Sequence, residues 1–155
     1  MVDLLQVLEG VTYAAFIVGA LVAVYELRVM SRDRRTELYS QMGEHWTSRE
    51  FEEAMAKYAL ADYQSAESIE KTVPRVDILM IADTLDWMAA LVRYKIVDYK
   101  TVTSVMTFSM NWEKLKPWCL EWRKHTTPGH FGDFEWLANE ENRRDKAAEQ
   151  ETKAA

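Results

Sequence analysis

Residues 74–95, PRVDILMIADTLDWMAALVRYK, decide the fold. Apolar side chains recur in this stretch at spacings of three and four residues, which is the period of an α-helix. One apolar stripe contains Ile78, Ile81, Leu85, Met88, Val92 and Ile96, and a second contains Val76, Met80, Trp87, Leu91 and Tyr94. Two stripes predict a helix that packs on two sides, at the centre of a helical bundle.

A second helix is predicted on the N-terminal side of this central segment. Thr47-Ser48-Arg49-Glu50 has the pattern of a capping box, in which a hydroxyl accepts an amide of the next turn and the glutamate reaches back. Apolar residues follow at helical spacing, so we expect a helix over about residues 48–61. The polar stretch 62–71 is expected to link it to the central helix.

The C-terminal side contains further helical patterns. Asp98 is expected to cap a short helix. Another helix is predicted after Asn111, and Pro117 either marks its first turn or kinks it. A turn over residues 126–132, which contains a proline and two glycines, precedes a last helix. That helix is expected to fade into a charged tail over residues 140–155, which is too polar to pack alone.

Composition agrees with an all-α fold and excludes several functional classes. The chain has 155 residues, of which 48% are apolar, and only 5 glycines and 3 prolines, too few for a turn-dense β fold. A net charge of −6 argues against a nucleic-acid binder. The single cysteine, Cys119, excludes an internal disulfide and any multi-cysteine metal site.

The first thirty residues are predicted to span a membrane. Residues 10–25 carry no charge, and flanking apolar residues extend the segment to about 25 residues, enough for a hydrocarbon core of roughly 30 Å. The predicted organisation is a transmembrane helix over 1–30, a cytoplasmic helical domain over 31–139 and a charged tail over 140–155. The serious alternative is that residues 10–25 form a buried helix of a soluble bundle.

The charges around this segment predict its orientation in the cell membrane. Residues 1–26 contain acidic side chains and no basic one, whereas Arg28, Arg32, Arg34 and Arg35 follow. Because positive charge is retained in the cytoplasm, the N-terminus is expected outside and the helical domain inside. The four arginines are also expected to contact lipid headgroups.

Small residues recur at helical spacing within the predicted span. They are Gly10, Ala14, Ala15, Gly19 and Ala23. Such a face lets a second transmembrane helix approach closely, so other transmembrane subunits are the expected partners.

Candidate catalytic groups are few. Asp83 and Asp86 lie three residues apart on one helical face, as paired carboxylates of acid–base or metal sites do, but neither is followed by a histidine three residues later. His45, His125 and His130 lack metal-ligand spacing, and no glycine-rich phosphate loop is present. We therefore expect no metal, no cofactor and no enzymatic activity.

An ordered set of features in the second half of the chain resembles a family pattern. The features are the helix Ile78–Tyr94 with internal acids, the junction Ile96-Val97-Asp98, then Trp112, Arg123 and Phe134-Glu135-Trp136-Leu137. They resemble a widespread, uncharacterised family of small prokaryotic proteins with one N-terminal transmembrane helix and a cytoplasmic helical domain of unknown function. The likeness covers roughly residues 10–138, and this chain has Tyr94-Lys95 where the family commonly has glycine.

The resemblance implies the same topology and no known activity. It also implies an internal ion pair between Asp86 or Asp83 and Arg123. If that pair exists, exchanging the two charges should rescue the single variants.

Three hypotheses for function follow. The leading one is a membrane-anchored, non-enzymatic interaction protein, an accessory or structural subunit of a larger membrane complex, which contacts lipid and binds no nucleic acid. The second is a membrane-anchored enzyme or ligand sensor that uses the Asp83/Asp86 acidic face. The third is a self-associating membrane scaffold, for which homo-oligomers are expected.

Overall fold

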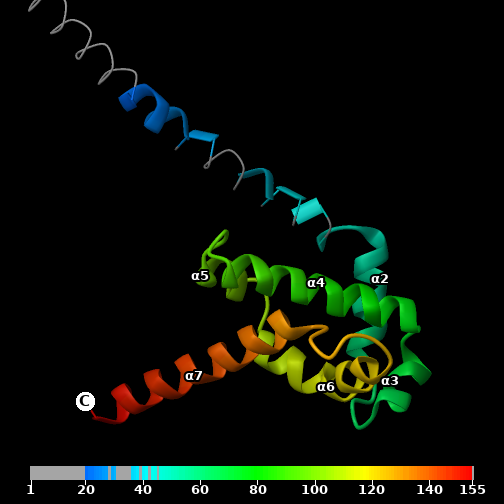
Figure 1. The fold of residues 1–155 in the computed structure, drawn as a ribbon. Coiled ribbons are helices and arrows are strands. Elements are labelled where there is room, and N and C mark those ends of the chain that lie inside the picture. Colours follow the sequence, from blue (N-terminus) through cyan, green and yellow to red (C-terminus); the bar gives the residue numbers. More distant parts are fainter. Residues whose placement is uncertain are drawn as a thin grey trace, which may run out of the picture. The chain divides into compact units, whose positions relative to one another are not determined.

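The computed structural model describes residues 20–27, 29–30, 36–38, 40–41, 43–44 and 46–154. Every regular element among these residues is a helix, which confirms the predicted all-α class (Figure 1). The chain divides into two compact units, residues 1–43 and residues 44–155. Helices α2 to α7 all belong to the second unit.

In the first unit, residues 20–27 are helical. Their side chains are exposed, including the apolar residues Leu21, Val22 and Leu27. Among the residues that the structure describes, no helix combines the length and the apolar character needed to cross a membrane. Residues 1–19 of the predicted span lie outside the described residues.

Helices α2 (Arg49–Ala59) and α3 (Ala66–Thr72) are each preceded by a serine at the N-cap. The Ser48 hydroxyl accepts a hydrogen bond from the amide of Phe51 over 3.3 Å, as the predicted capping box requires of its hydroxyl. Helix α3 lies in the stretch predicted to be a linker, so that prediction was wrong. Ser65 caps α3 and Ile69 is fully buried, and this one anchor is too short a pattern to indicate a helix.

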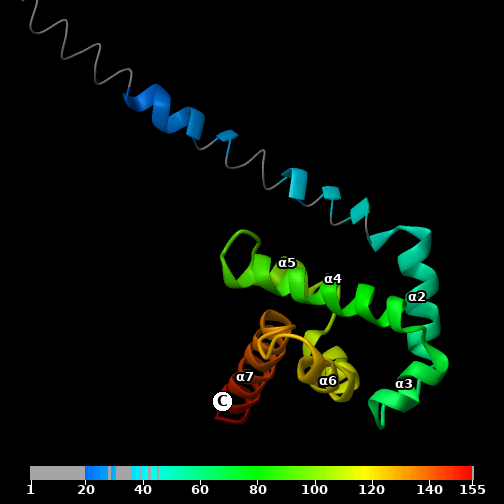
Figure 2. The ribbon, with the colours of Figure 1, turned by 45° about the vertical axis from the view of Figure 1, so that its right-hand side comes forward.

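Helix α4 (Arg75–Arg93) is the central helix that the sequence predicts, with Pro74 at its N-cap. It packs chiefly against α7 and also against α2 (Figures 1 and 2). Five residues of the first stripe are buried: Ile78, Ile81, Leu85, Met88 and Val92. In the second stripe Val76, Trp87 and Tyr94 are exposed, Met80 is half-buried and Leu91 is buried, so this stripe does not form the second packed side that the sequence predicts.

The C-terminal end of α4 forms a tight, hydrogen-bonded turn. The Lys95 amide donates to the Val92 carbonyl over 3.0 Å, and the Ile96 amide donates to the Leu91 carbonyl over 2.9 Å. These two bonds define a Schellman motif. Lys95 occupies its left-handed position with a φ of 59°, the conformation that favours glycine.

Helices α5 (Tyr99–Thr103) and α6 (Phe108–His125) follow. Asp98 stands at the N-cap of α5, but its side chain accepts no capping hydrogen bond, which corrects the predicted cap. The sequence predicts α6 after Asn111, but the helix begins at Phe108 and continues through Pro117. The proline lies inside the helix and does not mark its first turn.

Helix α7 (Gly132–Ala154) begins at the last residue of the predicted turn and continues across residue 140. Its first turns pack against α4 and α6, where Phe134 contacts Phe108 and Trp112 edge to face. Residues 142–153 are exposed, so the polar segment extends the helix into solvent (Figure 2). Within residues 46–153, Glu141 is the last buried residue, with 6% of its surface exposed.

Candidate functional site

Asp86 lies on α4 and faces the first turn of α7. Its Oδ1 atom accepts hydrogen bonds from the backbone amides of Asp133, over 3.0 Å, and Phe134, over 2.9 Å. The residue that precedes α7, Phe131, has Gly132 after it and no side-chain acceptor of its own. Asp86 therefore supplies from another helix the acceptor that a serine or aspartate ordinarily provides at the N-cap.

The surroundings of Asp86 shift its pKa upward. Burial raises the pKa of this carboxyl above its ordinary value, while the hydrogen bond from the Phe134 amide opposes the shift. Asp83, one turn earlier on α4, is exposed, and its Oδ1 atom lies 3.6 Å from Nε2 of His130. The two predicted carboxylates therefore face different groups.

Arg123 holds the turn that leads into α7. Its Nε atom donates to the carbonyl of His130 over 2.7 Å, and its Nη2 atom donates to the carbonyl of Phe131 over 3.3 Å. Its Nη1 atom lies 2.8 Å from Oε2 of Glu135. Phe131 is buried and has a φ of 58°, which non-glycine residues rarely adopt, so Arg123 stabilises a strained turn.

The three residues predicted to form an ion pair thus have other partners. Arg123 pairs with Glu135, Asp86 accepts the amides of α7, and Asp83 lies beside His130. Within residues 46–154, no ion pair joins Arg123 to either aspartate. The physical reason is that the start of α7 offers free amides and the turn before it offers free carbonyls.

Sequence reasoning missed a second cap of the same kind. Oε2 of the buried Glu141 accepts a hydrogen bond from the amide of Ser109 over 2.6 Å, in the first turn of α6. The N-cap residue of α6, Thr107, makes no side-chain cap, and its carbonyl accepts a bond from Nδ2 of Asn111. The sequence around Ser109 gives no local signal for this contact, because Ser109 and Glu141 are 32 positions apart.

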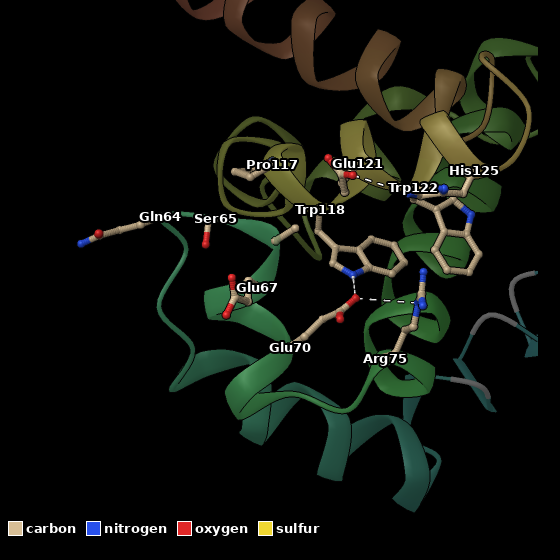
Figure 3. Close-up of a pocket in the computed structure, with 11 residues that line it drawn as sticks. Gln64, Ser65, Glu67, Glu70, Arg75, Pro117, Trp118, Glu121, Trp122 and His125 are labelled. Atoms are coloured by element: carbon tan, nitrogen blue, oxygen red, sulfur yellow. Dashed lines mark hydrogen bonds and ion pairs between the residues drawn. The ribbon is translucent and has the colours of Figure 1, made fainter.

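A cavity of about 600 Å³ lies between α3 and α6 (Figure 3). Trp118 and Trp122 stack on its wall, with ring centroids 5.0 Å apart. Nε1 of Trp118 donates to Glu70 over 2.8 Å, and the guanidinium of Arg75 lies 4.7 Å from the ring centroid of Trp122. Arg75 and Glu70 are also joined, over 3.7 Å. The aromatic surfaces of this cavity are therefore largely covered by the chain's own side chains.

The other carboxylates of this cavity are also paired. Glu67 contacts Lys71 over 3.4 Å, and Glu121 contacts Lys124 over 2.5 Å. In the described part of the chain, no cluster of three or more histidine, cysteine and acidic residues is placed to hold a metal. Burial raises the pKa of the Cys119 thiol to about 12, so this cysteine stays protonated at neutral pH.

The exposed and half-buried residues of the second stripe of α4 lie along one face of that helix. We call this face the outer surface of α4, and it consists of Val76, Met80, Trp87 and Tyr94. Val76 is 71% exposed and Tyr94 is 69% exposed, although both are spaced as core residues of a helix would be. Exposed large apolar side chains that gather on one face are typical of a protein interaction surface.

Most of the residues predicted to contact membrane partners or lipid lie outside the described residues. Gly10, Ala14, Ala15 and Gly19 lie outside the described residues, whereas Ala23 is described and lies exposed on the helical segment 20–27. The predicted headgroup contacts Arg28, Arg32, Arg34 and Arg35 also lie outside the described residues. Both predictions stay predictions.

Comparison with known proteins identifies a family. Residues 14–141 match the model of a family described as a domain of unknown function, DUF4760. No curated protein and no solved structure matches the chain. The match agrees with the expected uncharacterised family and covers nearly the same residues as the resemblance seen in the sequence.

Proposed function

The chain belongs to the DUF4760 family, whose function is unknown, and we propose that it is a membrane-anchored, non-enzymatic interaction protein. In this proposal it is an accessory subunit of a larger membrane complex in a prokaryotic cell. A transmembrane helix near residues 1–30 anchors it, and the helical unit of residues 44–155 binds the partner on the cytoplasmic side.

The observation that carries this proposal is the outer surface of α4. The central helix of the unit exposes Val76, Trp87 and Tyr94 on one face, while its opposite face is buried. Exposing such side chains to water is unfavourable by about 25 cal/mol per Å² of apolar surface. A partner subunit that covers this face would recover that free energy.

The roles of the acidic residues also favour binding over catalysis. Asp86 and Glu141 each accept backbone amides at the start of a helix, which is a structural task. Asp83 stands apart from Asp86 in its contacts and faces His130. A paired acid and base on α4 would require both carboxylates to face one substrate.

The anchor rests on the sequence. Residues 10–25 carry no charge, and the apolar side chains of residues 20–27 are exposed in the described structure. Lipid or another transmembrane helix would cover them. Resistance of the native protein to alkaline extraction from its membrane tests this part, and release into the alkaline wash would contradict it.

The interaction is tested by mild extraction of the native membrane, followed by mass spectrometry of what migrates with the chain. We expect one membrane protein in fixed stoichiometry with the wild type. The double variant Val76→Gln/Tyr94→Gln should reduce its recovery at least tenfold, because both side chains are exposed and their loss spares the core.

The matched control is Glu149→Gln/Glu151→Gln, two exposed residues on α7 whose replacement should leave the partner bound. A wild-type chain that migrates alone in several mild detergents would contradict the proposal. Recovery of homo-oligomers only would favour the self-associating scaffold instead.

A further inference from the structure

We infer that a groove between α2 and α6 binds an apolar side chain of a partner protein segment that carries a carboxylate within one helical turn of it. This inference rests on the proposed interaction function and specifies the chemistry of the partner. The groove has a volume of about 390 Å³ and lies beside the segment that joins α5 to α6. We call it the methionine groove.

The lining of the methionine groove combines a wall of apolar side chains with the polar residues Thr103, Ser104 and Thr107. It includes Met55 from α2, Met106 from the connecting segment and Met110 from α6, together with Val105. Val105 is 56% exposed and Met110 is 52% exposed, so the apolar wall is open to solvent. Unbranched, polarisable methionine side chains fit apolar ligands of varied shape, and they are frequent on surfaces that bind amphipathic helices.

The polar groups at the base of the groove are already satisfied. The Tyr58 hydroxyl donates to Oδ1 of Asn111 over 3.1 Å, and Nδ2 of Asn111 donates to the carbonyl of Thr107 over 2.7 Å. Burial raises the pKa of Tyr58 far above its ordinary value, so the phenol stays neutral. An apolar ligand group at the base would therefore leave the Tyr58 hydroxyl and the Asn111 amide with their hydrogen-bond partners.

Lys114 supplies the charge that selects the occupant. Its ammonium lies 5.1 Å from the ring centroid of Tyr63 and 5.8 Å from that of Tyr58. Among the described residues, no carboxylate lies within ion-pair distance of it. A carboxylate on the partner would complete this site, because it would meet an ammonium already held against two aromatic rings.

The geometry favours a helical segment as the occupant. In helix-in-groove binding, apolar anchors at positions i and i+3 or i+4 enter the groove while polar neighbours meet its edge. Met110 and Lys114 are four residues apart on α6, so the exposed methionine and the ammonium lie on one face of that helix, about one turn apart. An acidic, amphipathic helix matches both features.

The test uses the full chain in mild detergent, with its methionine methyl groups labelled with ¹³C for NMR. The probe is an 18-residue amphipathic helix with leucine anchors and glutamates beside them, and its matched control carries lysines in place of the glutamates. We expect the acidic peptide to shift the methyl signals of Met55, Met106 and Met110, and to bind at least tenfold more tightly than the basic peptide.

Two variants separate charge from shape. Lys114→Glu should reverse the preference between the two peptides, whereas Lys153→Glu, on the exposed end of α7, should leave it unchanged. Met110→Gln should weaken the acidic peptide at least fivefold without unfolding the chain, because Met110 is half exposed.

Three results of the peptide experiment would overturn the inference, and a fourth comes from the native partner. The first is an absence of shifts at the three methionines, and the second is a shift confined to Met80, which would place the peptide on the outer surface of α4. The third is an equal response to dodecanoate alone, which would mean a site for free anionic amphiphiles. If the native partner still migrates with Lys114→Glu, the groove is excluded while the proposed function stands.

Discussion

Lys95 has a left-handed backbone conformation, which is unfavourable for a residue that carries a side chain. Its φ of 59° closes the Schellman motif at the end of α4, and the left-handed conformation costs an L residue about 1–2 kcal/mol. Glycine avoids that cost but loses about 0.5–1 kcal/mol more in chain entropy. We therefore expect Lys95→Gly to raise the free energy of unfolding by about 0.5–1 kcal/mol.

Denaturant unfolding followed by circular dichroism measures this change. Lys95→Ala is the matched control, because alanine keeps the Cβ atom and should stay within about 0.5 kcal/mol of the wild type. Equal stabilisation by alanine would show that the backbone conformation is not the cause.

Asp86 stabilises the molecule through the amides of α7, so removing its acceptor should lower stability. We expect Asp86→Ala to cost about 1–2 kcal/mol and Asp86→Asn to cost less at pH 7, because asparagine can still accept both amides. Asp83→Ala, at an exposed position, should change the free energy of unfolding by less than about 0.5 kcal/mol.

Because the pKa of Asp86 is raised, the stability that Asp86 contributes depends on pH. The folded chain holds the proton more strongly than the unfolded chain, so stability from this group is full below the ordinary pKa of 3.8 and is lost as pH rises through the raised pKa. The free-energy gap between wild type and Asp86→Asn should therefore shrink from pH 3 to pH 7. A gap that widens over this range would mean a lowered pKa in the folded state.

Arg123 acts on the backbone as well as on a carboxylate, which decides the outcome of a charge exchange. Arg123→Glu should cost about 2 kcal/mol, because the carbonyls of His130 and Phe131 lose their donor. Combining it with Asp86→Arg should lower the free energy of unfolding further, since the amides of α7 then lose their acceptor. Recovery of the double variant to within about 0.5 kcal/mol of the wild type would instead establish a direct pair with Asp86.

At the scale of helices, α7 is one element with two different parts. Up to Glu141 it packs against the bundle, and beyond that residue its surface is exposed. Glu141 caps α6, and the guanidinium of Arg144 lies 4.0 Å from the ring centroid of Tyr99. A chain that ends at Lys146 keeps both contacts and should unfold within about 0.5 kcal/mol of the full chain.

Ending the chain at Glu140 removes both contacts. We expect that truncation to lower the free energy of unfolding by about 2 kcal/mol, since the amide of Ser109 loses a charged acceptor. Glu141→Gln in the full chain should cost less than the truncation, because the amide oxygen of glutamine can replace the carboxylate. Equal stability of the two truncated chains would refute a structural role for Glu141.

Periodicity predicted the helices that carry their own signals and missed those that depend on neighbours. The buried stripe of α4 and the serine cap of α2 each depend on residues that are a few positions apart in the sequence, so both could be predicted. The end of α6 at His125 follows from the turn after it, but its start at Phe108 depends on Glu141, from far along the chain. The exposed stripe of α4 has the same spacing as a buried one, and only the positions of the other helices distinguish them.

The candidate site shows the same division at the scale of the molecule. The sequence marks Asp86 and Arg123 as charged groups near a core, and the structure gives both a function at the junction of α4, α6 and α7. Their partners could not be predicted, because backbone amides and carbonyls have no signature in sequence. The methionine groove likewise requires α2 and α6 to meet, and their residues lie about fifty positions apart.

At the scale of the whole molecule, the hydrophobic core of the described residues lies in the second unit. The buried apolar residues run from Phe51 to Ala138, all within residues 44–155. A chain that consists of residues 44–155 therefore keeps that core and its caps. We expect it to unfold in a single cooperative transition, with a melting temperature within about 4 °C of that of the same unit in the full chain.

Circular dichroism of the fragment in buffer and of the full chain in mild detergent provides the comparison. Agreement would mean that the first unit contributes location and partner contacts, while the second unit supplies its own stability. A fragment that is unfolded, or that melts more than about 8 °C lower, would mean that the second unit depends on residues 1–43 for part of its stability. Exposure of the outer surface of α4 in the second unit would then no longer argue for a partner site there, and the methionine groove would remain as the candidate.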